Sequence, residues 1–461
     1  MRERMLSEIA GALGLRRAGP DRPVGRVVVD SRGAGRGDLF VALRGSRTDG
    51  HRFVREATAR RAAVLVEEAD APGPGGPALF AASSLDALGA LAATVRSELT
   101  ARVVGITGSN GKTTTKDFTA AVAATRWVTH ASPRSFNNEV GVPLTILGAA
   151  PDTEVLVCEI GAGAVGEIAA LCRIVRPEIG IVTNIGVAHL ETFGSRANVE
   201  RAKGELVESL PERGVAVLNV DDPRVRRLGV HTSASVVTFG RGDADVRARR
   251  VRLDGEGRAS FVLEADGEAH AVRLPAPGAH LVADALAAVA CGLALGVRPG
   301  PAAHALERAR LSPWRMEVLR SPSGVVVVND SYNANPDSVA AALRAAAGMN
   351  PRRLVAVLGP MAQLGSLSGP AHERVGALAA RLGACPIVAV GPEGAAIRRG
   401  ALAHRGSTTV LLAADAADAE RTVRRIVRPG DVVLVKGSRI SGLERVALSL
   451  AGRQMPSAEP Y

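Results

Sequence analysis

The stretch Gly105–Lys116, GITGSNGKTTTK, decides the fold because it joins a β-type run to a helical pattern through a glycine-rich turn. Gly108 and Gly111 allow backbone N–H groups to point toward a triphosphate, while Lys112 supplies positive charge and Thr113 a hydroxyl for Mg²⁺. The sequence therefore predicts an ATP site on a parallel-sheet domain. The expected nucleotide ligands in this loop are Gly108, Ser109, Asn110, Gly111, Lys112, Thr113 and Thr114.

The loop is a variant of the usual GxxxxGK[ST] motif. Ile106 stands where the first glycine is expected, and Gly105 lies one place early. A glycine turn that contains a lysine by chance is the alternative, and the order of strand, glycines, Lys-Thr and helix argues against it. Such a loop indicates nucleotide use without identifying the reaction.

Composition limits the class of protein. The chain has 461 residues, of which 46% are hydrophobic and 22% charged, as in a globular protein of several domains. Its net charge is +11 but only 3% of residues are aromatic, which leaves few stacking platforms for nucleic acid. We therefore expect phosphorylated small molecules as partners, and no nucleic acid.

Other global features predict a cytoplasmic protein without membrane insertion. The N-terminal residues show no apolar signal region, and the apolar stretch 281–297 is interrupted by Asp284, so it is interpreted as a buried helix. The four cysteines lie far apart and form no CxxC pair, so neither a zinc site nor a disulfide framework is indicated.

The strand and helix patterns predict an α/β fold with three domains. Residues 1–98 are expected to form a small N-terminal α/β domain. Apolar β-branched runs alternate with helical segments over 99–310, which predicts a parallel-sheet ATPase domain, with a small antiparallel sheet inserted at about 233–274. A second alternation over 311–461 predicts a Rossmann-like C-terminal domain.

Three further polar residues are candidates for chemistry. Glu159 ends the run EVLVCE and His189 follows the run GIVTNIG, so both are expected where parallel strands present their ligands. Lys203 lies on an expected helix shortly afterwards. Each residue also has an ordinary explanation: a helix cap, a loop histidine and a solvent-facing lysine.

With these motifs in place, the chain resembles the Mur ligase family over nearly its whole length. DSRGAGRGDLFVALRGSRTDGHRFV, residues 30–54, is similar to the family's uridine-binding domain, and NNEVGVPLTIL, residues 137–147, to its muramoyl-binding segment. The resemblance implies substrate contacts at Ser31, Arg32, Asp49, Gly50, His51, Asn137 and Asn138.

The resemblance also implies a two-metal site. Thr113 and Glu159 are expected to hold one Mg²⁺, and His189 with a carbamylated Lys203 the other. A carbamate converts a cationic amine into an anionic oxygen ligand, which suits a hard cation. The expected catalytic residues are Lys112, His189, Lys203 and Arg315.

The C-terminal half indicates the branch of the family. SPWRMEV places Arg315 at the phosphates, and NDSYNANP has the form typical of members that add a dipeptide. The resemblance implies an ATP-dependent ligase that acts as a monomer on a UDP-sugar tripeptide and D-alanyl-D-alanine through an acyl phosphate. Further expected contacts are Asp330 to the nucleotide, and Tyr332, Asn333, Asn335, Lys436, Ser438 and Arg439 to the substrates.

The chain departs from the family pattern in two segments. In GAHLVADALAA the nucleotide-site residue His280 is kept, but Leu281 and Asp284 replace two asparagines, so adenine recognition is expected to differ. In LGPMAQLG, Pro360 and Gln363 replace acidic residues near the acceptor pocket. Two alternatives therefore stay open: a paralogue that uses another amine, and a nucleotide-binding homologue without turnover. A folate-type ligase is disfavoured, because that branch lacks the uridine-binding segments.

Overall fold

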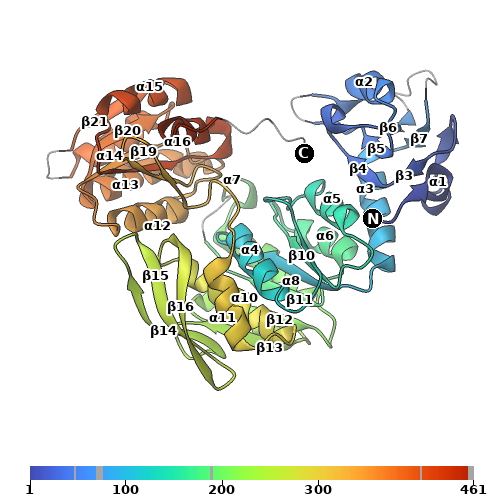
Figure 1. Cartoon of the computed structure of the whole chain (residues 1–461), viewed down its shortest axis with the longest axis horizontal. Coiled ribbons are helices and arrows are strands. Elements are labelled where there is room, and N and C mark those ends of the chain that lie inside the picture. The colour runs from blue at the N-terminus through green and yellow to red at the C-terminus, as the bar shows by residue number, and fades with distance from the viewer. Residues whose placement is uncertain (46–47, 69–75, 187–189, 405–407, 455–461) are drawn as a thin grey trace.

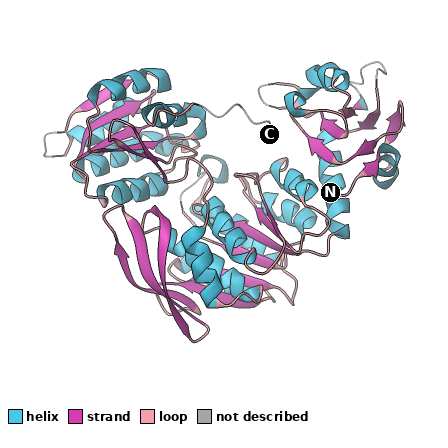
Figure 2. Ribbon diagram, viewed as in Figure 1, coloured by secondary structure: helices cyan, strands magenta, loops and turns pink. Residues whose placement is uncertain are grey.

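The computed structural model describes residues 1–45, 48–68, 76–186, 190–404 and 408–454. These residues form three α/β units in chain order, each built around a mainly parallel sheet with helices packed on it (Figures 1 and 2). None of the described helices is long and apolar enough to cross a membrane.

The N-terminal unit contains a five-stranded sheet in the order β2-β7-β6-β5-β4. Strands β4 to β7 pair in parallel, and β2 pairs antiparallel with β7. A short β1-β3 pair lies beside this sheet. The elements are β1 (Arg4–Met5), α1 (Leu6–Leu13), β2 (Arg16–Ala18), β3 (Pro23–Val24), β4 (Arg26–Val28), β5 (Asp38–Val41), α2 (Val54–Ala59), β6 (Ala63–Glu67), β7 (Ala78–Ala81) and α3 (Ser84–Glu98).

The central unit contains a nine-stranded sheet in the order β16-β15-β14-β13-β12-β11-β8-β10-β9. The strands are β8 (Arg102–Thr107), β9 (Thr129–Ala131), β10 (Val155–Glu159), β11 (Ile179–Val182), β12 (Val215–Asn219), β13 (Ser235–Gly240), β14 (Val246–Leu253), β15 (Arg258–Ala265) and β16 (Glu268–Pro277). The helices are α4 (Lys112–Ala123), α5 (Gly141–Gly148), α6 (Glu167–Val175), α7 (Leu190–Phe193), α8 (Arg196–Glu208), α9 (Pro223–Arg227), α10 (Leu281–Ala294) and α11 (Pro299–Arg308).

The predicted antiparallel insert is only partly correct. Strand β13 belongs to the parallel part of the main sheet, and the antiparallel strands β14 to β16 extend that same sheet. The first residues of β13 are exposed, so the strand's polar start resembles an insert in the sequence. The predicted buried helix is confirmed as α10, whose residues are mostly buried against α4 and the sheet.

The C-terminal unit contains a six-stranded sheet in the order β17-β18-β22-β19-β20-β21, with only β17 antiparallel. Its elements are β17 (Glu317–Arg320), β18 (Val326–Asn329), α12 (Pro336–Ala347), β19 (Arg353–Leu358), α13 (Ser368–Arg381), β20 (Ala384–Val390), α14 (Gly394–Leu402), β21 (Val410–Ala413), α15 (Ala416–Ile426), β22 (Asp431–Lys436) and α16 (Glu444–Leu450).

The N-terminal and central units share one apolar core. Leu91 and Val95 of α3 pack in the same cluster as Ile146 of α5 and Ile168 of α6. Arg96 is buried at this junction, and its guanidinium donates to the carbonyls of Val175 at 2.8 Å, Leu99 at 3.1 Å and Arg176 at 3.4 Å. The chain passes between the two sheets near residue 98, but the core is continuous there. Separating the two units would expose apolar surface and break the buried hydrogen bond between Arg96 and the carbonyl of Val175.

We predict that Arg96→Ala lowers the free energy of unfolding by about 2 to 4 kcal/mol, because the buried carbonyl of Val175 and two partly buried carbonyls lose their donor. Urea denaturation measures the change. Arg96→Lys should lower the free energy of unfolding by less than Arg96→Ala does. As a control, Arg421→Ala removes an exposed arginine from α15 and should change this free energy by less than about 0.5 kcal/mol. An Arg96→Ala protein with the wild-type urea midpoint would show that this junction contributes little.

Candidate active site

The phosphate loop connects the end of β8 to the start of α4, as the sequence predicts. Gly108 has a φ of 142° and Gly111 a φ of 81°, a region that side chains other than glycine rarely adopt. A Cβ atom on Gly108 would lie 1.9 Å from Oγ1 of Thr183, and one on Gly111 would lie 2.2 Å from Oδ1 of Asp284. Both positions therefore favour glycine by conformation, and at Gly108 the backbone nitrogen of Asn184, 3.1 Å from such a Cβ, also limits the space.

Thr183 and Asn184, which directly follow β11, hold this loop, and neither was among the predicted site residues. The amide side chain of Asn184 accepts from the N–H of Asn110 at 2.9 Å and donates to its carbonyl at 3.0 Å. Thr183 donates its hydroxyl to the same carbonyl at 2.6 Å. The signal was present in the sequence, because a polar Thr-Asn pair directly follows an apolar parallel strand.

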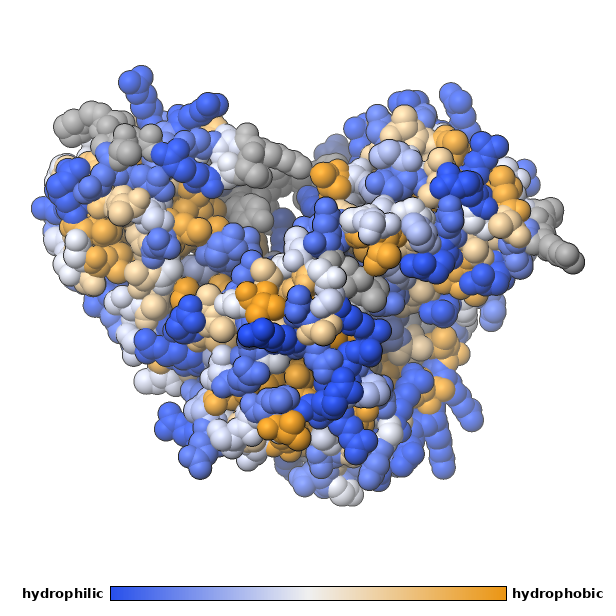
Figure 3. Space-filling view, turned by 180° about the vertical axis from the view of Figure 1, so that it is seen from behind, coloured by the Kyte–Doolittle hydropathy of each residue, from blue (hydrophilic) through white to orange (hydrophobic). Residues whose placement is uncertain are grey.

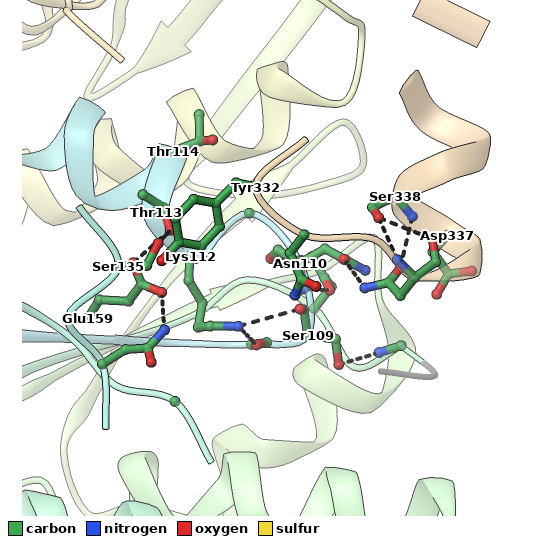
Figure 4. A pocket seen from close by; sticks show the side chains of 18 of the residues that line it. Ser109, Asn110, Lys112, Thr113, Thr114, Ser135, Glu159, Tyr332, Asp337 and Ser338 are labelled. Atoms are coloured by element: carbon green, nitrogen blue, oxygen red, sulfur yellow. Dashed lines mark hydrogen bonds between the residues drawn. The ribbon is translucent and has the colours of Figure 1, made fainter. Parts of the chain in front are cut away.

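Thr113 and Glu159 meet at the foot of the loop, where a metal ligand pair was expected. The Thr113 hydroxyl donates to Oε2 of Glu159 at 2.7 Å, and Nδ2 of Asn137 donates to Oε1 at 2.6 Å. Ser135, another residue that the sequence analysis missed, lies 2.7 Å from the Thr113 hydroxyl. Figure 4 shows Thr113, Ser135 and Glu159 converging on one side of the loop. One carboxylate and one hydroxyl suit Mg²⁺, which takes few protein ligands and completes its shell with phosphate oxygens and water.

Two lysines line the site, of which Lys112 is half-buried and Lys203 is buried. Lys112 turns back on the loop and donates to the carbonyl of Gly108 at 2.7 Å; burial lowers its pKa, and Glu159 partly opposes that shift. Lys203 lies on α8 and is only 3% exposed, so the solvent-facing alternative is wrong. Burial and the nearby Lys112 lower the pKa of Lys203 to about 7. His189, the expected metal ligand, lies outside the described residues.

The C-terminal unit contacts the phosphate loop through Asn335 and the loop that carries Ser135 through Arg315. Arg315 donates from Nη2 to Oγ of Ser135 at 2.7 Å, and its guanidinium lies 4.3 Å from the ring centroid of Tyr332. Asn335, the N-cap of α12, donates from Nδ2 to Oδ1 of Asn110 at 2.7 Å. Residues from two units therefore surround the position expected for the triphosphate.

Deeper in the C-terminal unit, Lys436 is held by its own domain. Its ammonium donates to Oδ2 of Asp330 at 2.5 Å and to the carbonyl of Asn333 at 2.8 Å, and burial lowers its pKa. Ser438 differs from the expectation of a substrate contact. Its hydroxyl is buried and accepts from the N–H of Ala362 at 2.9 Å, so it holds that loop and does not face the cavity.

One cavity of about 1350 Å³ collects most of the predicted site residues. Five expected substrate contacts of the N-terminal unit do not line it: Ser31, Arg32, Asp49, Gly50 and His51. The N-terminal unit stands apart from the C-terminal unit (Figure 1), and a notch separates these two units on the molecular surface (Figure 3). The predicted residues that do line the cavity are Gly108, Ser109, Asn110, Gly111, Lys112, Thr113, Thr114, Asn137, Asn138, Glu159, Lys203, His280, Asp284, Arg315, Asp330, Tyr332, Asn333, Asn335, Lys436 and Arg439.

Comparison with known proteins identifies the family. Models described as "Mur ligase family, catalytic domain", "Mur ligase middle domain" and "Mur ligase, glutamate ligase domain" match residues 23–96, 106–292 and 314–439. The UDP-N-acetylmuramoyl-tripeptide–D-alanyl-D-alanine ligase of Mycobacterium tuberculosis is 41% identical, over 93% of this chain and 92% of that protein. The chain belongs to the Mur ligase family.

Solved structures agree with this assignment. MurF from Acinetobacter baumannii is 31% identical with a TM-score of 0.87, covering 98% of this chain and 100% of that one. MurF from Thermotoga maritima, solved in complex with ADP, is 29% identical with a TM-score of 0.79, covering 93% and 97%. The expected three-domain α/β fold is confirmed, and this Mur ligase is an ATP-dependent enzyme.

Asp284, which replaces an asparagine of the Mur ligase sequence pattern, lies beside Gly111 of the phosphate loop. Its Oδ1 accepts from the Thr115 hydroxyl at 3.3 Å, and burial raises the pKa of the carboxyl to about 8, against the opposing effects of Thr115 and Arg315. At neutral pH the group is therefore mostly protonated, and a protonated carboxyl offers one donor and one acceptor, as an asparagine amide does. The substitution thus adds little negative charge beside the phosphates at neutral pH.

We predict that ATP affinity falls as the pH rises through about 8, because the Asp284 carboxyl then becomes an anion under the phosphate loop. Calorimetric titration with ATP between pH 7 and pH 9 measures the dependence. Asp284→Asn, which keeps the shape but cannot ionise, should weaken this dependence while binding ATP at pH 7 within about threefold of wild type. Equal pH dependence in the two proteins would contradict a raised pKa at Asp284.

Proposed function

We propose that this Mur ligase joins D-alanyl-D-alanine to a UDP-N-acetylmuramoyl-tripeptide, with ATP converted to ADP and phosphate. The observation that carries the proposal is one cavity lined by three segments: the phosphate loop, the Asn137–Asn138 segment and the stretch from Tyr332 to Asn335. The last stretch has the dipeptide-type sequence, and the M. tuberculosis relative carries the name of this activity.

The chemistry proceeds by activation and then capture. An oxygen of the substrate carboxylate attacks the γ-phosphorus of ATP, the bond to the bridging oxygen breaks, and ADP leaves. The free amine of the dipeptide then attacks the acyl carbon, the C–O bond to phosphate breaks, and an amide, phosphate and a proton result. ATP is needed because a free carboxylate is a poor acylating agent.

The chain's own residues neutralise charge and set positions. The N–H groups of the loop and the start of α4 face the phosphates, and Lys112 and Arg315 balance oxygens that accumulate charge. In this proposal Lys112 leaves the carbonyl of Gly108 when the triphosphate arrives. Thr113 and Glu159 are the proposed ligands of one Mg²⁺, which, when bound, screens the phosphate charge.

Lys203 is proposed to carry a carbamate and to hold a second Mg²⁺ together with His189. A pKa of about 7 leaves much of the amine neutral near pH 8, and only a neutral amine attacks carbon dioxide. In that step the new C–N bond forms and one proton leaves the nitrogen. The buried position beside Lys112 favours an anion over a second cation.

The N-terminal unit is proposed to bind the uridine through Ser31, Arg32, Asp49, Gly50 and His51. These residues lie outside the cavity in this open arrangement, so substrate binding requires the outer units to approach each other. Closure would exclude water from the acyl phosphate, which otherwise hydrolyses. We propose the units 1–98, 99–310 and 311–461 as the three functional domains of a monomer.

We predict that ADP release from wild type depends on both the UDP-muramoyl-tripeptide and D-alanyl-D-alanine. Lys112→Ala should lower kcat by about 100-fold or more while the protein unfolds at the wild-type temperature, because a charge used in the transition state is lost. A coupled ADP assay measures this. Because Pro360 and Gln363 replace acidic residues, the assay also includes D-alanine and dipeptides other than D-alanyl-D-alanine. Faster turnover with another amine would favour a paralogue that uses that amine. ADP release that does not depend on any acceptor would favour a nucleotide-binding homologue without turnover.

Carbamylation generates a separate prediction. With ¹³C-labelled bicarbonate at pH 8, wild type should show a carbamate carbon signal that Lys203→Arg lacks, because the arginine side chain stays protonated. The signal should weaken as the pH falls below about 7, where the Lys203 amine gains a proton. Identical spectra from the two proteins would exclude a carbamate at this position.

A further inference from the structure

The linker between the central and C-terminal units is fastened to the phosphate-loop helix by Asp117. This residue lies on α4, one turn after Thr113, and so on the same face of the helix. Its Oδ2 accepts from the backbone N–H of Ser312 at 2.6 Å and its Oδ1 from the Ser312 hydroxyl at 3.0 Å. Ser312 lies between the end of α11 and the start of β17, three residues before Arg315.

The adjacent Lys116 fastens a second loop to the same turn of α4. Its ammonium donates to the carbonyls of Ser132 at 2.8 Å and Arg134 at 3.0 Å, and lies 2.8 Å from Oδ1 of Asp117. Those carbonyls belong to the loop that carries Ser135. One helical turn therefore fixes both the segment that presents Arg315 and the segment that presents its acceptor.

The backbone around Arg315 explains why such an anchor is needed. Trp314 has a φ of 62° and Met316 a φ of 50°, so the residues on both sides of Arg315 occupy the left-handed region that bulky side chains avoid. A strained segment persists only when its surroundings hold it. Here it is held on one side by Asp117 through Ser312, and on the other by the N–H of Met316, which donates to Oδ1 of Asp330 at 3.1 Å.

The contacts form a closed ring. Asp117 holds Ser312, the strained turn presents Arg315, Arg315 donates to Ser135, and the Ser135 hydroxyl lies 2.7 Å from that of Thr113 on the same helix as Asp117. We propose that Asp117 is a positioning residue, which sets the Arg315 guanidinium at the phosphates by anchoring the linker. The inference rests on the proposed role of Arg315 in the reaction.

A double-mutant cycle between Asp117 and Arg315 tests the proposal. Asp117→Ala should lower kcat by about 10- to 100-fold, as expected when a charge is misplaced by about 1 Å, with a smaller effect on KM for D-alanyl-D-alanine. Arg315→Ala should lower kcat by at least the same factor. If Asp117 acts through Arg315, the double variant should be within about threefold of Arg315→Ala alone. A double variant whose loss equals the product of the single losses would overturn the proposal.

Two matched variants separate positioning from folding. Asp117→Asn keeps one acceptor for Ser312 and should retain most of the activity that Asp117→Ala loses. Asp21→Ala removes the same pair of bonds elsewhere, because Asp21 accepts from the N–H of Ser7 at 2.9 Å and from its hydroxyl at 2.7 Å in the N-terminal unit. The Asp21 variant should keep wild-type kcat.

Fluorescence gives a readout that does not depend on turnover. The chain has two tryptophans, and in a Trp127→Phe background only Trp314, buried under the Arg439 guanidinium, emits. Release of the linker in Asp117→Ala should shift this emission to longer wavelength, and Asp117→Asn should not. Unchanged emission in Asp117→Ala would contradict the proposal that Asp117 anchors the linker. If the emission shifts but the wild-type protein shows no dipeptide-dependent ADP release, the anchor stands and the proposed function is contradicted.

Discussion

The close packing of the phosphate loop against its neighbours is the constraint on which the site depends. Gly108 packs so closely on Thr183 and the backbone of Asn184 that a β-carbon does not fit there, and a β-carbon on Gly111 would displace the Asp284 carboxyl. The loop is thereby confined between the end of β11 and the start of α10, and hydrogen bonds from Thr183 and Asn184 to Asn110 hold its backbone. Preorganised donors of this kind need no rearrangement when charge develops on the phosphates.

From the phosphate loop, polar contacts extend to the C-terminal unit. The N-terminal unit shares its apolar core with the central one, so the pair packs as a single body. The described apolar clusters of the C-terminal unit contain no residue before Met316. Arg315 and Asn335 contact the central unit through hydrogen bonds to Ser135 and Asn110. Hydrogen bonds at a polar interface exchange for water more readily than an apolar core opens. Domain closure is therefore more easily accommodated between the central and C-terminal units than between the N-terminal and central units.

Burial sets the charge state of the groups around the cavity. Desolvation lowers the pKa of Lys112, Lys203 and Lys436 and raises that of Asp284. Desolvation therefore disfavours the charged form of each of these groups. Negative phosphates would favour the protonated forms of all four groups, which are cations for the lysines and a neutral carboxyl for Asp284.

The sequence by itself determined the fold class, the family and most of the cavity lining, because these depend on local patterns: apolar strands followed by polar residues, and glycines before Lys112 and Thr113. It did not determine Ser135, Asn184 or Asp117 as parts of the site, since a serine, an asparagine and an aspartate acquire a role only when distant segments meet. The protonation of Asp284 and the lowered pKa of Lys203 were likewise decided by tertiary structure, because desolvation depends on what packs around a group and not on its neighbours in the chain.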